Sequence, residues 1–527
     1  MRKRVNAIFP VIFPVIFILF STVLAGAVAP AADGEEFRAS CGSTGWYFAE
    51  GYTGGDFDTW ITIQNPNQTD ATAHLRFFLN DGDPVDMDLP LGKETRTSVL
   101  LNSIPALKNK EVATMVTATG DGIIAERAMY FRYEGGGAAR AGGHASIGAT
   151  DTSCYWYLPE GYTGGGFDTW LVLMNPTDTD ANDVYVKLLV PWSDQYYMFK
   201  TSVPAQRRRT IKIDDLVWKE GTDNLIADVG AATGGGGTGQ EVKFDNTEVS
   251  TYVFSNGGVG LVVERAMYFD YYGKAGGSCS MGAPSAASTW YLPEGYTGGD
   301  FDTWVEVMNP SGDYVDIVYT FYSNKPGFTP VSVTHPGVKP WSRDTIKVDA
   351  VPGLEGTDVS TKVQAYKAGT TTPAYVVAER AMYFRYGTAS DGHTSIGAAH
   401  AYNYWFLAEG YTGGSFDTYV CVMNPMSIPM KVKATFMTPS GHTVKKEYDV
   451  PAYYRLTIKV DDQDPSLAAT DVSTMIEAET LGGASAEYQA GMIAGVVAER
   501  AMYFTYRDPI DGSLKSGGSC SIGYGSY

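Results

Sequence analysis

Two acidic residues recur in a glycine-rich stretch that the chain repeats four times. The first copy reads "WYFAEGYTGGDFDTW" from Trp46, and the others begin at Trp156, Trp290 and Trp405. Paired carboxylates can hydrolyse a glycosidic bond, bind Ca²⁺ or form ion pairs with basic side chains. Each copy places a Glu eight residues before an Asp: Glu50 and Asp58, Glu160 and Asp168, Glu294 and Asp302, Glu409 and Asp417.

The context of this loop disfavours catalysis. A phosphate-binding loop precedes a helix and usually carries a Lys, whereas this loop has no Lys and runs into a strand pattern. Four equivalent hydrolytic sites in one chain would be unusual, the histidines are mostly at unmatched positions, and no C-x-x-C occurs. We expect no enzymatic activity. The glycine pair should supply positive φ in a tight turn, with the four Asp side chains bonding their own turn backbone.

A second motif supplies basic partners for these acids. The segment "ERAMYF" begins at Glu126, Glu264, Glu379 and Glu499. We expect the loop acids to pair with its arginines, because a charge in an otherwise apolar strand needs partners; these are Arg127, Arg265, Arg380 and Arg500. We expect no cofactor. Structural calcium stays open as an alternative, since acidic turns can bind Ca²⁺ although the chain has no contiguous calcium-loop motif.

The elements that position these motifs form a repeat of about 110 to 135 residues. Alternating apolar and polar runs that end at Gly, Pro, Asn or Asp predict seven or eight strands per copy. We predict an all-β fold of four tandem immunoglobulin-like antiparallel β-sandwich domains, joined by short linkers into a rod. The predicted domains span residues 46–150, 151–284, 285–400 and 401–527.

The N-terminus and the charge limit the location and the partners. A basic start and an apolar run predict a signal peptide over residues 1–31, followed by a linker over 32–45; an uncleaved anchor is the alternative. We therefore expect a secreted or cell-surface protein with no transmembrane segment in the mature chain. The net charge of −20 argues against nucleic acid as a partner.

The ordered motifs "WYLPEG", "GGFDTW", "NP", "ERAMYF" and "SIG" resemble the tandem repeats of large secreted bacterial surface proteins. The segments "GGHASIG" and "DGHTSIG" fit that pattern, while "GGSCSMG" and "GGSCSIG" replace the His with Ser and add a Cys. The resemblance implies a β-rich module and a surface location. It supplies no catalytic residues.

Comparison of the four copies separates core from surface. Two aliphatic columns, which begin at Ile61 and Ile63, are predicted to face the core, and the alternate column is predicted to face outward because its chemistry is mixed. That column is Thr62, Val172, Glu306 and Cys421. The same outward face carries the candidate binding residues Trp60, Trp170, Trp304 and Tyr419. Three interpretations stay open: cover by a neighbouring loop or domain, a platform for sugar rings, or a stripe that packs subunits together.

The cysteines suggest three outcomes. Cys154 and Cys279 are predicted to form a disulfide in the second domain, provided that its first and last strands are neighbours. Cys421 is predicted to be a free thiol that reacts with maleimide. Cys41 and Cys520 lack partners in their own domains, so they are either free thiols or a head-to-tail link between chains.

Together these patterns predict a secreted or cell-surface protein with a structural or adhesive role. Self-assembly of the protein into a larger structure is one form that this role could take. Its partners would be other copies of itself or cell-surface polymers. The alternative is a polysaccharide-binding protein that uses the outward aromatic residues.

Overall fold

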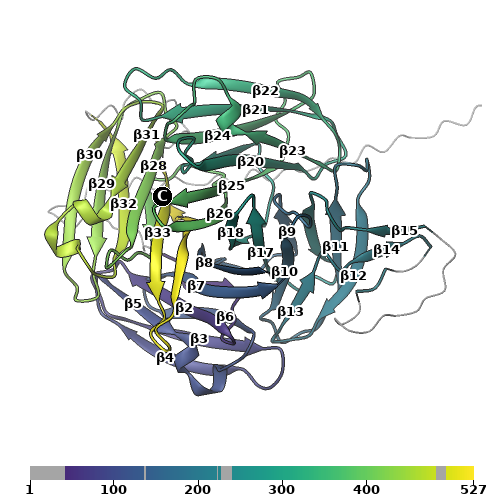
Figure 1. Cartoon of the computed structure of the whole chain (residues 1–527). Helices are drawn as coiled ribbons and strands as arrows, with labels where there is room; N and C mark the ends of the chain where they lie inside the picture. The colour runs from purple at the N-terminus through teal and green to yellow at the C-terminus, as the bar shows by residue number, and fades with distance from the viewer. Residues whose placement is uncertain (1–41, 136–137, 222–223, 227–239, 482–493) are drawn as a thin grey trace, which may run out of the picture. The chain divides into compact units, whose positions relative to one another are not determined.

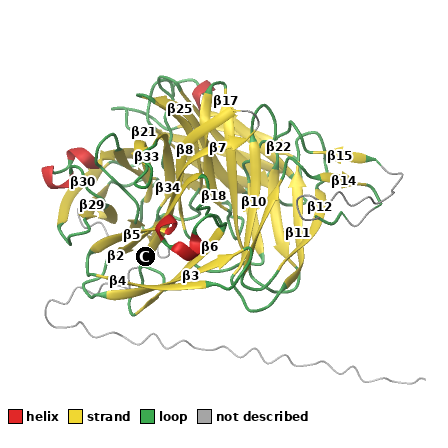
Figure 2. Cartoon of the chain, turned by 60° about the horizontal axis from the view of Figure 1, so that its bottom comes forward, coloured by secondary structure: helices red, strands yellow, loops and turns green. Residues whose placement is uncertain are grey.

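The computed structural model describes residues 42–135, 138–221, 224–226, 240–481 and 494–527. The predicted signal peptide, most of the following linker and Cys41 lie outside these residues. Within them, every regular element is a β-strand or a single turn of 3₁₀ helix (Figure 2). The predicted all-β fold is confirmed. No helix in the described part of the chain has the length and apolar composition needed to cross a bilayer.

The first repeat folds into two antiparallel sheets of four strands. One sheet has the order β1-β6-β3-β4 and the other the order β5-β2-β7-β8. The strands are β1 (Gly45–Phe48), β2 (Asp56–Asn65), β3 (Ala71–Leu79), β4 (Val85–Leu91), β5 (Thr95–Leu100), β6 (Val112–Thr119), β7 (Ile124–Gly135) and β8 (Ala138–Ile147). Two 3₁₀ turns, Leu101–Ser103 and Pro105–Leu107, connect β5 to β6.

The second repeat has the same two sheets, β12-β11-β16-β9 and β13-β10-β17-β18, and an added hairpin β14-β15. Its strands are β9 (Tyr155–Leu158), β10 (Asp168–Asn175), β11 (Ala181–Leu189), β12 (Tyr197–Val203), β13 (Arg207–Lys212), β14 (Val217–Lys219), β15 (Glu241–Lys243), β16 (Ser250–Ser255), β17 (Val262–Tyr271) and β18 (Lys274–Met281).

The third repeat forms the sheets β19-β24-β21-β22 and β23-β20-β25-β26. Its elements are β19 (Thr289–Leu292), β20 (Phe301–Asn309), β21 (Val315–Ser323), β22 (Val331–Val338), β23 (Ser342–Lys347), the 3₁₀ turn Val348–Ala350, β24 (Val359–Lys367), β25 (Val377–Tyr386) and β26 (Ala389–Ile396).

The fourth repeat adds a short fifth strand to one sheet, giving β30-β29-β32-β27-β35 and β31-β28-β33-β34. Its elements are β27 (Tyr404–Leu407), β28 (Asp417–Asn424), β29 (Met430–Met437), β30 (Thr443–Val450), β31 (Tyr454–Lys459), the 3₁₀ turns Val460–Asp462 and Pro465–Leu467, β32 (Ser473–Thr480), β33 (Val497–Arg507), β34 (Leu514–Ile522) and β35 (Tyr524–Ser526).

The two-sheet antiparallel sandwich is thus confirmed in every repeat. In the first repeat β2 pairs with β5 and β3 with β6, as the equivalent strands do in an immunoglobulin domain. The order differs at the margins of the sheets, because β1 pairs with β6 and β7 pairs with β2. The first strand and the strand of the closing "SIG" or "SMG" motif therefore lie in different sheets in each repeat, while the short β35 that follows in the fourth repeat pairs with β27.

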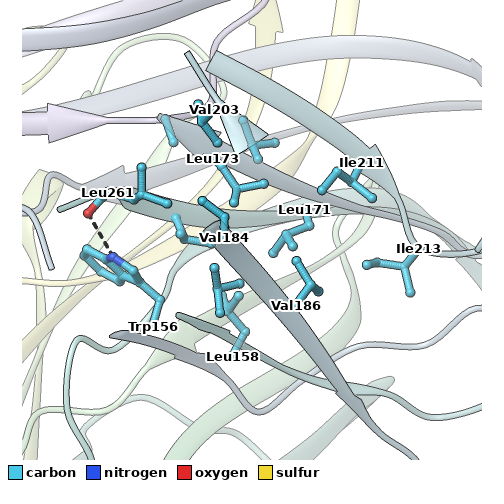
Figure 3. Packing of buried hydrophobic residues seen from close by; sticks show 14 of the residues in the cluster. Trp156, Leu158, Leu171, Leu173, Val184, Val186, Val203, Ile211, Ile213 and Leu261 are labelled. Atoms are coloured by element: carbon cyan, nitrogen blue, oxygen red, sulfur yellow. Dashed lines mark hydrogen bonds between the residues drawn. The ribbon is translucent and has the colours of Figure 1, made fainter. Parts of the chain in front are cut away.

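The core of each sandwich forms around the first Trp of the repeated stretch. Trp156 is buried, and its indole N–H donates to the carbonyl oxygen of Leu261 at 2.9 Å (Figure 3). Trp46, Trp290 and Trp405 make the equivalent bond to Ile123, Val376 and Val496. The aliphatic columns of the second strand pack in the same cores, as predicted: Ile61, Leu171, Val305, Val420, Ile63, Leu173, Val307 and Val422 are all buried.

The four repeats form a closed ring, and the predicted rod is wrong. The closing strand of each repeat lies beside two others: β8 contacts β18 and β34, and β26 contacts the same two strands (Figure 1). Residues Ser40–Tyr527 accordingly form one compact unit. The short linkers are compatible with a rod, but a rod would leave the apolar outer faces of the "ERAMYF" strands in water, and the ring buries them.

Candidate functional site: the interfaces and clefts between repeats

The repeated glycine-rich loop is the turn that leads into the second strand of each repeat. The second glycine of each pair has a positive φ, between +56° and +63°: Gly55, Gly165, Gly299 and Gly414. This confirms the predicted tight turn, since only glycine adopts that conformation without strain. The loop of each repeat lies against the next repeat in the ring, and its glutamate makes its contacts there.

The glutamate of each loop forms a buried ion pair with the next repeat. Glu50 of the first repeat meets Arg208 of the second at 3.0 Å, where Arg208 lies on β13. The other pairs are Glu160 and Arg343 at 3.0 Å, Glu294 and Arg455 at 2.6 Å, and Glu409 and Arg96 at 2.6 Å. Burial raises the pKa of Glu50, and the charge of Arg208 opposes that rise. The prediction that these acids pair with the "ERAMYF" arginines is therefore wrong for the carboxylates.

The "ERAMYF" segments form a second set of ion pairs that runs around the whole ring. The arginine of each repeat binds the glutamate of the next: Arg127 to Glu264 at 2.6 Å, Arg265 to Glu379 at 2.8 Å, Arg380 to Glu499 at 2.8 Å, and Arg500 back to Glu126 at 2.5 Å. All eight side chains are buried. Burial alone would lower the pKa of Arg127, but the nearby acidic groups, chiefly the carboxylate of Glu264, together outweigh burial and raise that pKa.

These arginines do contact the loops, through the backbone. Arg127 donates to the carbonyl oxygen of Glu50 at 3.2 Å, and Arg265 donates to that of Glu160 at 2.8 Å. In return, Glu264 accepts the N–H of Ala49 at 2.8 Å. Each loop is therefore fixed by its backbone and by its glutamate to groups of the neighbouring repeat.

The aspartates of the loops also bind basic side chains, so the predicted bonds to their own turn backbone are wrong. Asp168 accepts from Arg140 of the first repeat at 2.9 Å, and Asp302 accepts from Lys274 of the second. Asp58 and Asp417 bind Lys515 and Lys459, respectively. A cation on each carboxylate competes with Ca²⁺ for the same oxygens. In the described part of the chain, no group of three His, Cys, Asp or Glu side chains could hold a metal ion.

The column of mixed chemistry faces the neighbouring repeat and not water, so the predicted outward exposure is wrong. Thr62 and Cys421 donate to the loop glutamates Glu409 and Glu294, at 2.6 Å and 2.7 Å. Val172 is buried as well. Glu306 is 3% exposed, and its burial, followed by the nearby charge of Glu160, raises the pKa of Glu306 well above its ordinary value.

The four candidate aromatic residues are half-buried, and the preceding repeat covers one side of each. The indole N–H of Trp60 donates to the hydroxyl of Tyr506 at 3.3 Å, and the hydroxyls of Tyr419 and Tyr386 lie 3.0 Å apart. Trp170 packs against an apolar cluster with Tyr133 of the first repeat, and Trp304 packs against one with Tyr271 of the second repeat. The ammonium groups of Lys212 and Lys347, from the same repeats as the two Trp residues, lie 5.6 Å and 5.4 Å from their ring centroids. Of the three interpretations that the sequence left open for these aromatic residues, cover by an adjoining domain applies to the buried side of each ring.

The uncovered side of three of these aromatics lines a cleft between repeats. The Trp170 cleft holds about 590 Å³ between the first and second repeats, and the Trp304 cleft holds about 590 Å³ between the second and third. The Trp60 cleft, between the fourth and first repeats, holds about 360 Å³. These volumes lie within the usual range of ligand pockets, roughly 300 to 1,000 Å³.

The walls of the clefts are aromatic and their margins are polar. In the Trp170 cleft, the first repeat contributes Tyr52, Phe57 and Tyr133, together with Glu111, Arg132 and Glu134. The tyrosine of the "EGYTGG" loop has the same place in the other two clefts, as Tyr162 and Tyr411. Comparison of the copies did not select these tyrosines, because each one completes a cleft whose Trp belongs to the following repeat. Their identity in all four loops was the available signal.

The predicted disulfide between Cys154 and Cys279 does not form, and both cysteines are free. Cys154 lies immediately before β9 and Cys279 lies on β18, and these strands belong to different sheets. The thiol of Cys279 donates to Glu264 at 3.2 Å.

Cys421 is free, as predicted, but it is buried, which contradicts the expected accessibility to maleimide. Cys520 is also buried, and its thiol donates to Glu499 at 3.0 Å. A link between chains through Cys520 therefore has no accessible thiol at that end.

No protein-family model matches the chain, and no curated protein matches it. Among solved structures, a Thermotoga maritima protein, 1070, is similar at 16% identity and a TM-score of 0.19, covering 21% of this chain and 97% of that one. The Anabaena sensory rhodopsin transducer is similar at 18% identity and a TM-score of 0.15, covering 19% and 94%. A tetra-tandem repeat from the extending region of a large adhesion protein is similar at 9% identity and a TM-score of 0.08, covering 88% and 94%. Similarity at this level assigns no function to the chain.

Proposed function

We propose that this protein is a secreted, non-enzymatic polysaccharide-binding protein whose sugar sites are the clefts between successive repeats. The observation that carries the proposal is the repeated cleft with a Trp on one wall, Tyr residues on the other and charged groups at its margin. Aromatic faces pack against the apolar faces of sugar rings, while polar groups at the margin bond the hydroxyls. Binding to a polymer at the cell surface would also provide an adhesive role.

Several equivalent clefts on one ring suit a repetitive ligand. A polymer that reaches two clefts binds the second one at a high effective concentration, so weak individual sites add to a tight overall interaction. The net charge of −20 favours neutral or cationic polysaccharides over anionic ones.

The charges in the clefts support binding over hydrolysis. A glycoside hydrolase requires two carboxyl groups that are free to act on the substrate. In the Trp170 and Trp304 clefts, the loop glutamates Glu50 and Glu160 are paired with Arg208 and Arg343. The second acid that the two clefts share, Glu111 in one and Glu248 in the other, lies on the same arginine as the loop glutamate, at 3.5 Å and 2.9 Å. Neither acid of the shared pair is therefore free to act on a substrate.

The closed ring weighs against open-ended self-assembly. Head-to-tail fibres need a complementary surface left free at each end of the unit. Here the fourth repeat binds the first through Arg500 and Glu126, with the same contacts that join the other repeats. We therefore favour cell-surface polysaccharide over other copies of the chain as the partner.

Titration with soluble polysaccharides tests the proposal. Neutral glucans, mannans and amino-sugar polymers would be added to the purified protein while Trp fluorescence and heat of binding are recorded. We expect at least one polymer to quench fluorescence, and we expect Trp170→Ala with Trp304→Ala to weaken its binding about tenfold or more, because buried Trp contacts dominate binding energies.

The matched control is Trp192→Ala. Trp192 is 52% exposed and does not line any of the three clefts, so this variant should bind as the wild type does. Absence of binding across the panel, or equal loss in the control and cleft variants, would overturn the proposal.

A further inference from the structure

At the axis of the ring, one repeat carries a side chain where the other three have glycine. The closing strands β8, β18, β26 and β34 lie beside one another at this axis, and each brings a dipeptide to it. Three of the dipeptides are Gly-Gly, at residues 142–143, 276–277 and 517–518, and the third repeat has Asp391-Gly392. One carboxyl group therefore lies where the other repeats have no side chain.

All four repeats bond to that carboxyl group. Its oxygens accept backbone N–H groups from Gly143 at 3.4 Å, Gly277 at 2.9 Å, Gly392 at 2.8 Å and Gly518 at 3.1 Å. Asp391 is fully buried. No Lys, Arg or His in the described residues forms an ion pair with it, and its hydrogen-bond donors are the four backbone N–H groups. Burial raises the pKa of Asp391 well above its ordinary value, and the bonds from the four N–H groups, which favour the ionised form, oppose that rise.

The space around the carboxyl group requires the three glycines. A Cβ atom at Gly142, Gly276 or Gly517 would lie 2.5 Å, 1.6 Å or 2.1 Å from an oxygen of Asp391. The axis accommodates one side chain, and the backbone supplies four converging donors for it. Converging backbone N–H groups are a recurrent way of binding anions in proteins.

We infer that the axis of the ring is an anion-binding site, built from one backbone N–H of each repeat, which the chain fills with its own Asp391 carboxylate. The ligand class is a small monovalent anion: a carboxylate of the size of formate or acetate, or a halide. Removal of the Asp391 side chain would leave the four donors in place and open the site to such an anion.

Moving the carboxylate to another repeat tests the inference on the full chain. Asp391→Gly should lower the melting temperature, and the double variant Gly276→Asp with Asp391→Gly should restore it, because the second repeat presents its glycine to the same four donors. Gly276→Asp alone puts two carboxyl groups in a space for one and should melt below the wild type. A double variant that is no more stable than Asp391→Gly would contradict a common site.

Small anions provide the second arm. The Asp391→Gly protein, refolded in sodium formate, should show a melting temperature that rises with formate concentration. The wild type should show no rise beyond the effect of ionic strength, which is measured in sodium sulfate. Bulky benzoate should stabilise neither protein. Equal responses of the two proteins to formate would overturn the anion site.

A direct readout covers the case in which formate does not act. Crystals of the Asp391→Gly protein grown in bromide should show an anomalous peak between the four glycine N–H groups. An empty axis in that crystal, together with no formate response, would refute the inference. If Asp391→Gly does not fold, the double variant with Gly276→Asp still decides, since its recovery of folding requires that the two positions serve one site.

Discussion

The contact that closes the ring gives the sharpest test of the architecture. Glu126 lies on β7 of the first repeat and Arg500 on β33 of the fourth, and both side chains are buried. Glu126 accepts from Arg500 at 2.5 Å and from the N–H of Ala408 at 2.7 Å. Glu126→Gln removes the charge while it keeps an oxygen for Ala408, and it leaves the Arg500 guanidinium buried without its carboxylate.

The structure sets the size of this effect. Breaking a buried ion pair on one side typically costs about 3 to 5 kcal/mol, because the remaining charge is uncompensated. Arg500 keeps one bond, to the carbonyl oxygen of Glu409 at 3.1 Å, so we expect the lower part of that range. Arg500→Met in the Glu126→Gln background removes the orphaned charge. It should recover about 2 kcal/mol of the loss.

Urea unfolding, followed by Trp fluorescence, measures Glu126→Gln, Arg500→Met and the double variant against the wild type. The informative quantity is the coupling between the two substitutions. In a ring the residues touch, and the double variant is more stable than the sum of the single losses; in a rod they would be far apart, and the losses would add. Additive losses, or a loss below about 1 kcal/mol for Glu126→Gln, would refute the closing ion pair.

Two further predictions concern thiols and pH. Maleimide should leave Cys279, Cys421 and Cys520 unmodified in the folded protein and label all three in denaturant, as measured by intact mass. The reason is that burial blocks access to each thiol and raises its pKa. Labelling of Cys421 in the folded protein would contradict its burial. Burial also raises the pKa of Asp214 to about 6 in the folded protein, above the ordinary value that it has in the unfolded chain. The unfolded chain therefore loses this proton at a lower pH than the folded protein does, and the free energy of unfolding falls as the pH rises from about 4 to 6. Asp214→Asn keeps the bond to the N–H of Thr169, as Asn102 does in the first repeat. In thermal melts recorded at different pH values, Asp214→Asn should be more stable than the wild type by on the order of 1 kcal/mol above pH 6, a value that allows for the partial exposure of the side chain. Below pH 4 the two proteins should be equally stable. A constant difference at every pH would contradict this prediction.

The sequence by itself determined the repeat, the strands and the cores. Alternation of side chains along a strand is a local property, so the columns that begin at Ile61 and Ile63 could be assigned to the core without knowledge of any long-range contact. The tight turn followed from the glycines in the same way, since positive φ is a property of one residue.

Only the tertiary structure decided how the repeats meet. Arg127 and Glu126 occur together in one segment, yet each binds a different repeat, and identical copies carry no information on which copy binds which. Thr62 and Cys421 suggested an exposed face because their chemistry differs, whereas each donates to a glutamate of a neighbouring loop.

The clefts between repeats and the Asp391 site at the axis also could not be predicted from the sequence. Trp170 was selected from its own repeat, but the tyrosines opposite it come from the repeat before, so no comparison of aligned positions could assemble the cleft. Asp391 was one letter of difference in a closing motif, and its meaning depends on four strands that converge from four repeats. Local periodicity encodes strands and cores, whereas a site shared by several repeats exists only once the chain has closed into a ring.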